Sequence, residues 1–348
     1  MDNPKPNFFE RTRGAQKVLV LDLGFLGDTV HLLPALWVVR QAYPKAELHV
    51  IVGAHVTSLI ECVPWVNGNW GYSRFPKHAT LGENLETVRR LRKQRYDVVI
   101  NLNGSDRSSW LTLLSGARER LGRVPQDGGP PLWRRLFTEV VAHPFSDEPA
   151  YLQKCHCLRK VGFPGDQAEF HVQISSKHLQ GARLTPADVR TFFHLSPFTT
   201  DDDKELRVEK MAELIDAVQE GFPDKKLAIS CAPNERERRK MDSLMSKVRR
   251  RPWRLHAGDL SLVELAALIG QSALHLSGDT GTLHLALMTG VATVAWFRTA
   301  QGMKAWIPEG PRHRTLLGNG PGPDSFRGIS VADALEAIKN VTAYVSKG

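Results

Sequence analysis

The sequence predicts an α/β protein that contains two doubly wound parallel sheets. Apolar strand-like runs alternate with helix-like runs along the chain, and this alternation begins afresh near residue 191. The length of 348 residues exceeds one typical core and suits two domains of ordinary size. Each half is therefore expected to form its own sheet, with helices on both faces.

The first half begins with VLVLDLGFLGDTVHLLPALWVV (18–39), where a β-branched run breaks at glycine and continues with helical spacing. The further predicted elements are strands at 47–53 (ELHVIVG) and 96–104 (YDVVINLNG), a helix through RRLRKQ (89–94), a short helix and strand near 114–123, and a loop at QDGGPPLW (126–133). Together they predict an N-terminal domain over residues 1–172.

Residues 173–190 have weak periodicity and several turn residues, which predicts a connector between the domains. The second half then gives a strand and loop from 191 to 200, a helix over 208–219, a strand at 226–233, a helix from Glu235, a helix over 260–270, a strand before Gly278, and a closing helix over 329–345. The C-terminal domain is thus predicted over residues 191–348, and both domains are expected to be doubly wound.

Composition describes a globular protein, with 42% hydrophobic and 24% charged residues. A net charge of +9 favours polyanionic partners, which include nucleic acid, an anionic membrane surface and phosphorylated substrates. The basic runs at 89–95, 236–240 and 247–254 lack interleaved aromatic residues and match no common nucleic-acid module. Nucleic acid is therefore not expected as a partner.

Four cysteines, Cys62, Cys155, Cys157 and Cys231, lack the paired spacing of a zinc site and the pattern of a disulfide framework. No role is assigned to Cys155 or Cys157. The polar N-terminus has no signal-peptide core, and no run reaches about 18 apolar residues. A cytoplasmic protein without a membrane span is expected.

Two copies of Gly-Asp-Thr, at 27–29 and 278–280, each follow a strand-like run and open a helix-like run. Backbone N–H groups at a helix start can hold an anion, and the aspartate adds a carboxylate beside it. The two copies suggest half-sites for an anionic donor and an acid–base residue.

Asp28 is expected in a strand-to-helix loop at the carboxyl edge of the first sheet, where such folds bind ligands. The alternative is an aspartate that only caps the helix. Gly24 and Gly27 flank the turn and permit close approach of a ligand or backbone. The segment lacks the G-x-G-x-x-G fingerprint, which removes the main support for an oxidoreductase. His31 suits either a site or a packing role.

The segment SPFTTDDDKELR (196–207) places Thr199, Thr200 and Lys204 near a helix start, a combination suited to phosphate. Its aspartates at 201–203 suggest either a metal motif or, preferably, helix capping. Residues 277–282 are small and allow several N–H groups to converge on an anion. His284 then either donates to a phosphate oxygen or packs in the core.

These motifs together resemble glycosyltransferase family nine, the bacterial ADP-heptose:lipopolysaccharide heptosyltransferases. The resemblance is carried by LDLGFLGDTVHLLPAL, YDVVINLNG with LSGARERLG, SPFTTDDDKELR and, most specifically, LSLVELAALIGQSALHLSGDTGTLHLALMTGVATVAWF. It implies the GT-B architecture, in which two Rossmann-like domains face a central cleft. The N-terminal domain would hold the acceptor and the C-terminal domain the nucleotide sugar.

By position, the resemblance makes Asp28 the general base that removes a proton from the acceptor hydroxyl. The residues implied in donor binding are Thr199, Thr200, Lys204, Glu235 at the ribose, Leu260 at the adenine, Gly278, Asp279, Thr280, Gly281 and His284, and those on the acceptor side are Gly24, Phe25, Gly27 and His31. Many members carry serine or methionine where this chain has Phe25 and Leu26, so the acceptor stays open.

The leading expectation is an inverting, metal-independent transferase that uses ADP-heptose as substrate and needs no cofactor. It would act on an anionic inner-core lipopolysaccharide at the inner face of the cytoplasmic membrane, with peripheral contact to that surface. One alternative is a GT-B enzyme with another nucleotide sugar or another acceptor, and a second is a non-enzymatic module that binds polyanions.

Overall fold

A computed structural model describes residues 6–73, 80–125, 131–143, 148–165, 169–170, 172–308, 310–320, 322 and 325–347. Contacts divide the chain into two compact units, Met1–Gln173 and Ile174–Gly348. The segment predicted as a connector contains a helix, α9 (Ser176–Gly181), and the following Ala182 and Leu184 pack in a core cluster of the second unit.

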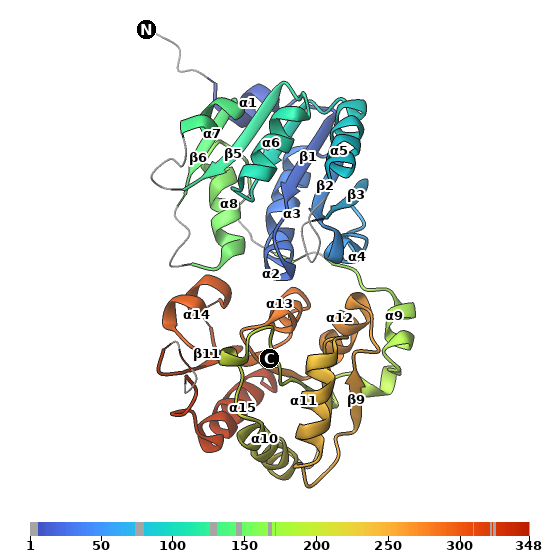
Figure 1. The fold of residues 1–348 in the computed structure, drawn as a ribbon, viewed down its shortest axis with the longest axis vertical. Coiled ribbons are helices and arrows are strands. Elements are labelled where there is room, and N and C mark those ends of the chain that lie inside the picture. The colour runs from blue at the N-terminus through green and yellow to red at the C-terminus, as the bar shows by residue number, and fades with distance from the viewer. Residues whose placement is uncertain are drawn as a thin grey trace. The chain divides into compact units, whose positions relative to one another are not determined.

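The first unit is built on a six-stranded parallel sheet with the order β3-β2-β1-β4-β5-β6 (Figure 1). Its strands are β1 (Lys17–Asp22), β2 (Glu47–Gly53), β3 (Gly68–Tyr72), β4 (Val98–Asn101), β5 (Glu119–Val124) and β6 (Glu139–Ala142). Its helices are α1 (Phe8–Thr12), α2 (Leu26–Val30), α3 (Leu33–Ala42), α4 (Thr57–Ile60), α5 (Leu81–Gln94), α6 (Asp106–Leu114), α7 (Pro131–Leu136) and α8 (Ala150–Lys160).

Both faces of this sheet are covered, which explains the continuous apolar run of β1. Leu19 and Leu21 pack in one cluster with Leu91 of α5 and Leu111 of α6. The intervening Val18 and Val20 are also fully buried. A strand buried on both faces needs apolar residues at every position, as in other parallel sheets.

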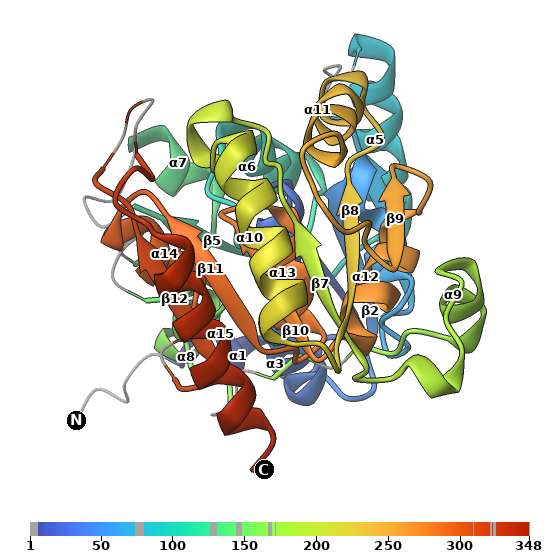
Figure 2. The same ribbon diagram turned by 90° about the horizontal axis from the view of Figure 1, so that it is seen from below.

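The second unit repeats the topology, with the order β12-β11-β10-β7-β8-β9. Its strands are β7 (Phe192–Ser196), β8 (Lys226–Cys231), β9 (Arg254–Ala257), β10 (Leu274–Gly278), β11 (Thr293–Phe297) and β12 (His313–Leu317). Besides α9, its helices are α10 (Val208–Gly221), α11 (Glu235–Met245), α12 (Leu262–Gln271), α13 (Gly281–Met288), α14 (Ala300–Trp306) and α15 (Val331–Val345). Figure 2 shows α10 and α15 side by side over this sheet.

The prediction of two doubly wound α/β units is confirmed by these two parallel sheets. One local prediction is wrong: residues 131–133 of the expected loop belong to α7, because Trp133 and Leu136 bury their side chains beside Val124. Residues 126–130 of that loop lie outside the described ranges.

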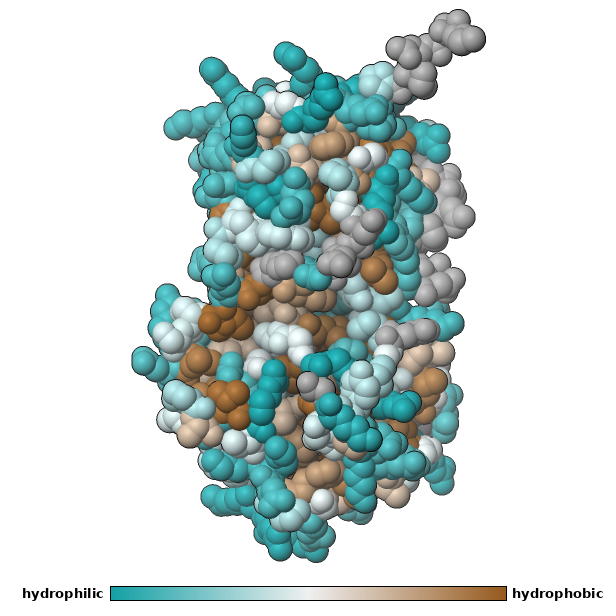
Figure 3. Space-filling view, turned by 180° about the vertical axis from the view of Figure 1, so that it is seen from behind, coloured by the Kyte–Doolittle hydropathy of each residue, from teal (hydrophilic) through white to brown (hydrophobic). Residues whose placement is uncertain are grey.

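The surface drawn in Figure 3 is mainly hydrophilic, with smaller apolar areas on each unit. Within the part of the chain that the structure describes, no helix is both long enough and apolar enough to span a bilayer.

Candidate active-site segments

Most predicted site residues follow central strands, at the point where each sheet reverses its strand order, whereas Glu235 follows β8 and Leu260 follows the edge strand β9. In the first unit that point lies between β1 and β4, and in the second between β7 and β10. Loops that leave neighbouring parallel strands in opposite directions open a crevice, which is where ligands bind in such sheets.

Asp28 lies in the first turn of the short helix α2, rather than in the loop where it was expected. Its half-buried carboxylate accepts a hydrogen bond from the Phe25 N–H at 2.9 Å, so it does cap the helix start. The Asp28 side chain also explains Gly24: a Cβ at Gly24 would lie 2.2 Å from the Asp28 Cβ. Gly24 is therefore needed for the close approach of Asp28 and not for an unusual backbone angle.

A buried ion pair supports this turn, and no pattern in the sequence indicates it. The Lys154 ammonium, from α8, lies 2.5 Å from the Asp22 carboxylate at the end of β1. Lys154 also donates to the backbone carbonyl of Asp28 at 2.7 Å. The other Asp22 oxygen accepts from the Gly24 N–H at 3.0 Å and from the Asn103 side chain, after β4, at 3.1 Å.

A second buried cation, Arg123 at the end of β5, lies close to these carboxylates. Burial lowers the pKa of its guanidinium, while Cys157, Asp22 and Asp28 act in the opposite direction. Arg123 donates to the Gln153 side chain at 2.7 Å, which holds the guanidinium against α8. Two buried cations, Lys154 and Arg123, therefore interact with the segment around Asp28.

The remaining acceptor-side residues differ in exposure. Phe25 is 57% exposed and its ring lies 6.5 Å from that of His55, so it offers an apolar surface beside Asp28. Gly27 is buried. His31 is fully buried, and its Nδ1 accepts from the backbone N–H of Tyr151 at 3.2 Å. The His31 ring thus supports the start of α8 and does not face solvent. Direct contact between His31 and an acceptor would require the ring to leave this buried position.

In the second unit, two predicted donor segments meet. Lys204 follows β7, Asp279 follows β10, and the Lys204 ammonium lies 2.6 Å from the Asp279 carboxylate. A Cβ on Gly278 would lie 2.8 Å from Trp296 Nε1 and 3.0 Å from the Lys204 carbonyl oxygen. Glycine at 278 thus permits the β7 loop to pack directly on the end of β10.

Helix α13 begins at Gly281, and the Thr280 side chain makes no capping hydrogen bond. The first backbone N–H groups of α13 have no partner within the helix and are suited to bind an anion. His284 lies one turn later and is buried against Trp306, with ring centroids 4.9 Å apart. Burial lowers the His284 pKa to about 4, so the ring is neutral at pH 7.

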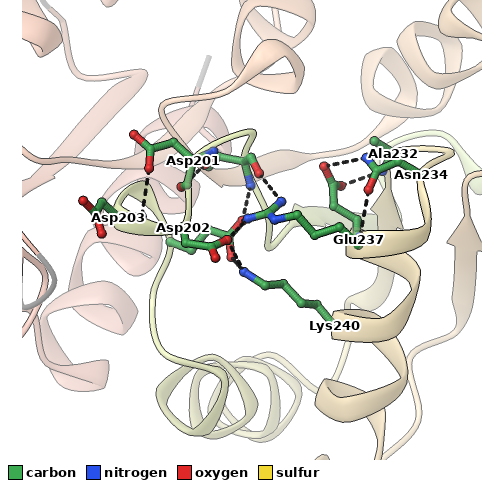
Figure 4. Close-up of polar contacts among 10 residues, drawn as sticks. Asp201, Asp202, Asp203, Ala232, Asn234, Glu237 and Lys240 are labelled. Atoms are coloured by element: carbon green, nitrogen blue, oxygen red, sulfur yellow. Dashed lines mark hydrogen bonds and ion pairs between the residues drawn. The ribbon is translucent and has the colours of Figure 1, made fainter.

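Figure 4 shows the three consecutive aspartates, of which Asp202 belongs to an ion-pair network. Asp202 pairs with Arg236 and with Lys240 of α11, and Glu205 pairs with the same two cations. Asp201 accepts from the Asp203 N–H at 3.1 Å. Cations and backbone donors therefore occupy the carboxylates of Asp201 and Asp202, which favours the capping interpretation over a metal motif.

Other predicted donor residues take local roles. Thr199 is buried, and its hydroxyl donates to the Asp201 carbonyl at 2.7 Å, whereas Thr200 is exposed. Glu235 is exposed and pairs with Arg239 one turn along α11. Leu260 is half-buried and packs on the cluster that contains Phe192 and Leu268. Contacts of these residues with a nucleotide remain predictions.

Comparison with known proteins decides the family. The profile of glycosyltransferase family 9 (heptosyltransferase) matches residues 85–322, which is more than half of the chain. The chain belongs to this family. It is accordingly a glycosyltransferase, as the resemblance of its motifs predicted.

Among curated relatives of this family 9 transferase, the lipopolysaccharide core heptosyltransferase OpsX of Haemophilus influenzae is 24% identical over 82% of this chain and 80% of the relative. The lipopolysaccharide heptosyltransferase 3 of Escherichia coli is 20% identical over 78% of this chain and 79% of the relative.

Solved structures share the fold. A family 9 glycosyltransferase from Veillonella parvula superposes with a TM-score of 0.81 at 18% identity, covering 94% of this chain and 97% of that one. The E. coli heptosyltransferase WaaC with ADP-2-deoxy-2-fluoro heptose gives a TM-score of 0.73 at 17% identity, covering 93% and 99%. These likenesses establish the GT-B type of fold for the family 9 transferase.

Proposed function

We propose that this family 9 transferase moves heptose from ADP-heptose to an inner-core lipopolysaccharide acceptor. The observation that carries the proposal is the meeting of Lys204 with the Asp279 loop and the start of α13, in a chain of the heptosyltransferase family. The relatives named as lipopolysaccharide heptosyltransferases support the acceptor class. The WaaC structure with a fluorinated ADP-heptose supports the donor.

The donor side is suited to a leaving diphosphate. Negative charge develops on that group as the sugar departs, so donors already in position stabilise the transition state. Lys204 supplies an ammonium, and residues 280–282 supply backbone N–H groups at a helix start. Among the described residues, the buried Trp296 Nε1 and Thr282 Oγ1 have no hydrogen-bond partner, and both border this loop.

The acceptor side is suited to general-base catalysis. The Asp28 carboxylate would accept the proton of the acceptor hydroxyl while the hydroxyl oxygen attacks the anomeric carbon and the bond to the diphosphate breaks. In this scheme Asp28 is the single base and no side chain of the protein attacks the sugar. The acceptor therefore displaces the diphosphate directly, which inverts the configuration at the anomeric carbon. A base of this kind contributes about 10²- to 10⁴-fold to the rate. The proposed reaction uses no metal and no cofactor.

The test is incubation with ADP-heptose and a panel of truncated core acceptors, with product masses and the anomeric configuration as readouts. A gain of one heptose on one acceptor with inverted configuration is expected. Calorimetric titration with ADP, UDP and GDP tests which nucleobase the donor carries. Tighter binding of UDP or GDP than of ADP would favour the alternative of another nucleotide sugar. Membership of a transferase family argues against the non-enzymatic alternative.

Peripheral contact with the cytoplasmic face of an anionic membrane is part of the same proposal. Helix α5 exposes Leu81 (78%) and Leu85 (52%), and its last two turns carry the exposed Arg89, Arg92 and Lys93. Apolar and basic side chains on one helix suit an anionic bilayer surface. Sedimentation with phosphatidylglycerol vesicles should deplete the protein from solution, and neutral vesicles should not.

A further inference from the structure

Three metal-ligating side chains of the first unit meet outside the segment that carries Asp28. His143 directly follows β6, Glu148 comes two residues before the start of α8, and His156 lies on α8. One ligand atom from each lies within 4.8 Å of the others. Among the residues that the structure describes, this is the group that combines three such ligands.

The two distances from Glu148 to the histidines are close to those between metal ligands. Glu148 Oε1 lies 3.1 Å from His143 Nε2 and 2.9 Å from His156 Nδ1. Nitrogen and oxygen ligands about 2.0–2.1 Å from a tetrahedral zinc ion lie about 3.3 Å from one another. Shifts of a few tenths of an ångström would therefore bring these two distances to the zinc value, and the ligand atoms of the two histidines already lie within 4.8 Å of each other. The ion would replace the two ring N–H groups that now donate to Glu148, and each ring would carry its proton on the other nitrogen.

The chemistry of the set is selective. Two imidazoles and one carboxylate suit zinc and other divalent transition metals, whereas calcium and magnesium prefer oxygen ligands alone. The His143 side chain is 8% exposed, but those of Glu148 and His156 are 28% and 34% exposed. An ion could thus enter from solvent and keep a water molecule in its fourth position.

Neighbouring contacts hold the ligands in place. The Gln153 side chain donates to the Glu148 carbonyl at 2.7 Å and accepts from Arg123 at 2.7 Å. The His143 N–H donates to the Val124 carbonyl at 3.3 Å, which fixes the end of β6 to β5. Such outer contacts orient metal ligands and raise affinity.

We propose that His143, Glu148 and His156 bind one divalent transition-metal ion of the zinc class, which fastens α8 to β6. Because the same helix carries Lys154, the ion would stabilise the element that holds Asp22 and the Asp28 carbonyl. The site has a structural role, and the proposed transfer reaction does not depend on it for chemistry.

The experiment uses the full chain after treatment with a chelator and dialysis. Titration with Co²⁺ should produce the visible absorption of a four-coordinate ion at one equivalent, and Zn²⁺ should abolish it by displacement. Zn²⁺ should also raise the unfolding temperature, since a ligand that binds only the folded state stabilises it. Glu148→Gln and His156→Ala should each lower the affinity for Zn²⁺ by more than about 100-fold. Loss of an outer contact costs up to about 100-fold, and each of these variants loses a direct ligand.

His178→Ala, which removes a half-buried histidine on α9 of the other unit, is the matched control and should bind like the parent chain. Circular dichroism verifies that each variant is folded. Absence of the Co²⁺ spectrum and of the thermal shift in the parent chain would overturn the proposal. So would equal affinity in the parent, Glu148→Gln and His156→Ala, because the three side chains would then form only a hydrogen-bonded cluster.

Discussion

Lys154 of α8 lies 2.5 Å from Asp22 at the end of β1, and the two side chains are 3% and 1% exposed. This buried ion pair joins residues 132 positions apart and fixes the turn that leads to Asp28. The remaining Asp22 oxygen accepts hydrogen bonds from the Gly24 N–H and from the Asn103 side chain. The pair therefore positions the predicted base through the backbone carbonyl of Asp28.

Replacement of one partner of this pair should be costly. Lys154→Met leaves the Asp22 carboxylate buried without its cation, which typically costs about 3–5 kcal/mol of unfolding free energy. Urea unfolding measures this loss. Lys17→Met is the matched control, because the Lys17–Glu47 pair at 2.9 Å is partly exposed and should be worth at most about 1 kcal/mol. Equal losses in the two variants would contradict the assigned role of the buried pair.

Asp28→Asn should separate catalysis from capping. Its amide oxygen can still accept from the Phe25 N–H, but it cannot take a proton, so turnover should fall about 10²- to 10⁴-fold with unchanged ADP affinity. Asp28→Ala should also bind donor and lose transfer. In the control, Asp333→Asn alters a carboxylate that accepts from the Ser330 N–H in the same way at the start of α15, and turnover should stay normal. Near-normal turnover in the Asp28 variants would refute the base assignment.

The central part of this fold was predictable from the sequence, and the candidate site residues stay predictions. Strands β1, β2, β4, β7, β8 and β10 were predicted because their residues are almost all buried on both faces. The edge strands β3, β6, β9 and β12 were missed, and each is partly exposed, which leaves little apolar pattern. The buried strand β11 was also missed, although its residues are all buried. Strand order alone then explains why the loops after β7 and β10 meet.

Long-range polar partners could not be predicted in the same way. Lys154 lies among ordinary helix residues, and nothing in its spacing points to Asp22. The Gly-Asp-Thr units were visible because their glycines, aspartates and strand–helix context are local in sequence. His31 carried no local signal that would separate a buried ring from a site residue, and only the packing of α8 decides it.

Lys204→Met should weaken binding of ADP and of the nucleotide sugar. It removes the ammonium proposed to contact the diphosphate, and hydrogen bonds to charged groups contribute about 1.5–3 kcal/mol, which corresponds to about 10- to 100-fold in affinity. Calorimetry of ADP binding measures the loss. Lys339→Met changes an exposed lysine on α15 and should leave affinity unchanged. An unaltered dissociation constant in Lys204→Met would show that the lysine serves only its pair with Asp279.

Stability should fall as the pH decreases below about 6.5, the ordinary histidine pKa. Burial lowers the pKa of His313 to about 4 and that of His284 to about 4, and it lowers those of His194 and His275 as well. The unfolded chain therefore binds more protons than the folded chain between pH 6.5 and 4, so protonation favours unfolding there. His313→Gln should flatten the dependence of unfolding free energy on pH in this window. An unchanged slope would contradict the lowered pKa.

Gly24→Ala should impair catalysis more than stability. The added methyl group would lie 2.2 Å from the Asp28 Cβ, so the Asp28 side chain must move away from its position on the turn. A displacement of about 1 Å at a reacting group can cost about 10²-fold in rate. Gly14→Ala is the matched control, since no atom lies within 4 Å of its new methyl group and its turnover should equal that of the parent. Normal turnover by Gly24→Ala, with unchanged ADP affinity, would contradict this prediction. It would show that Asp28 does not need its present position beside Gly24 for catalysis.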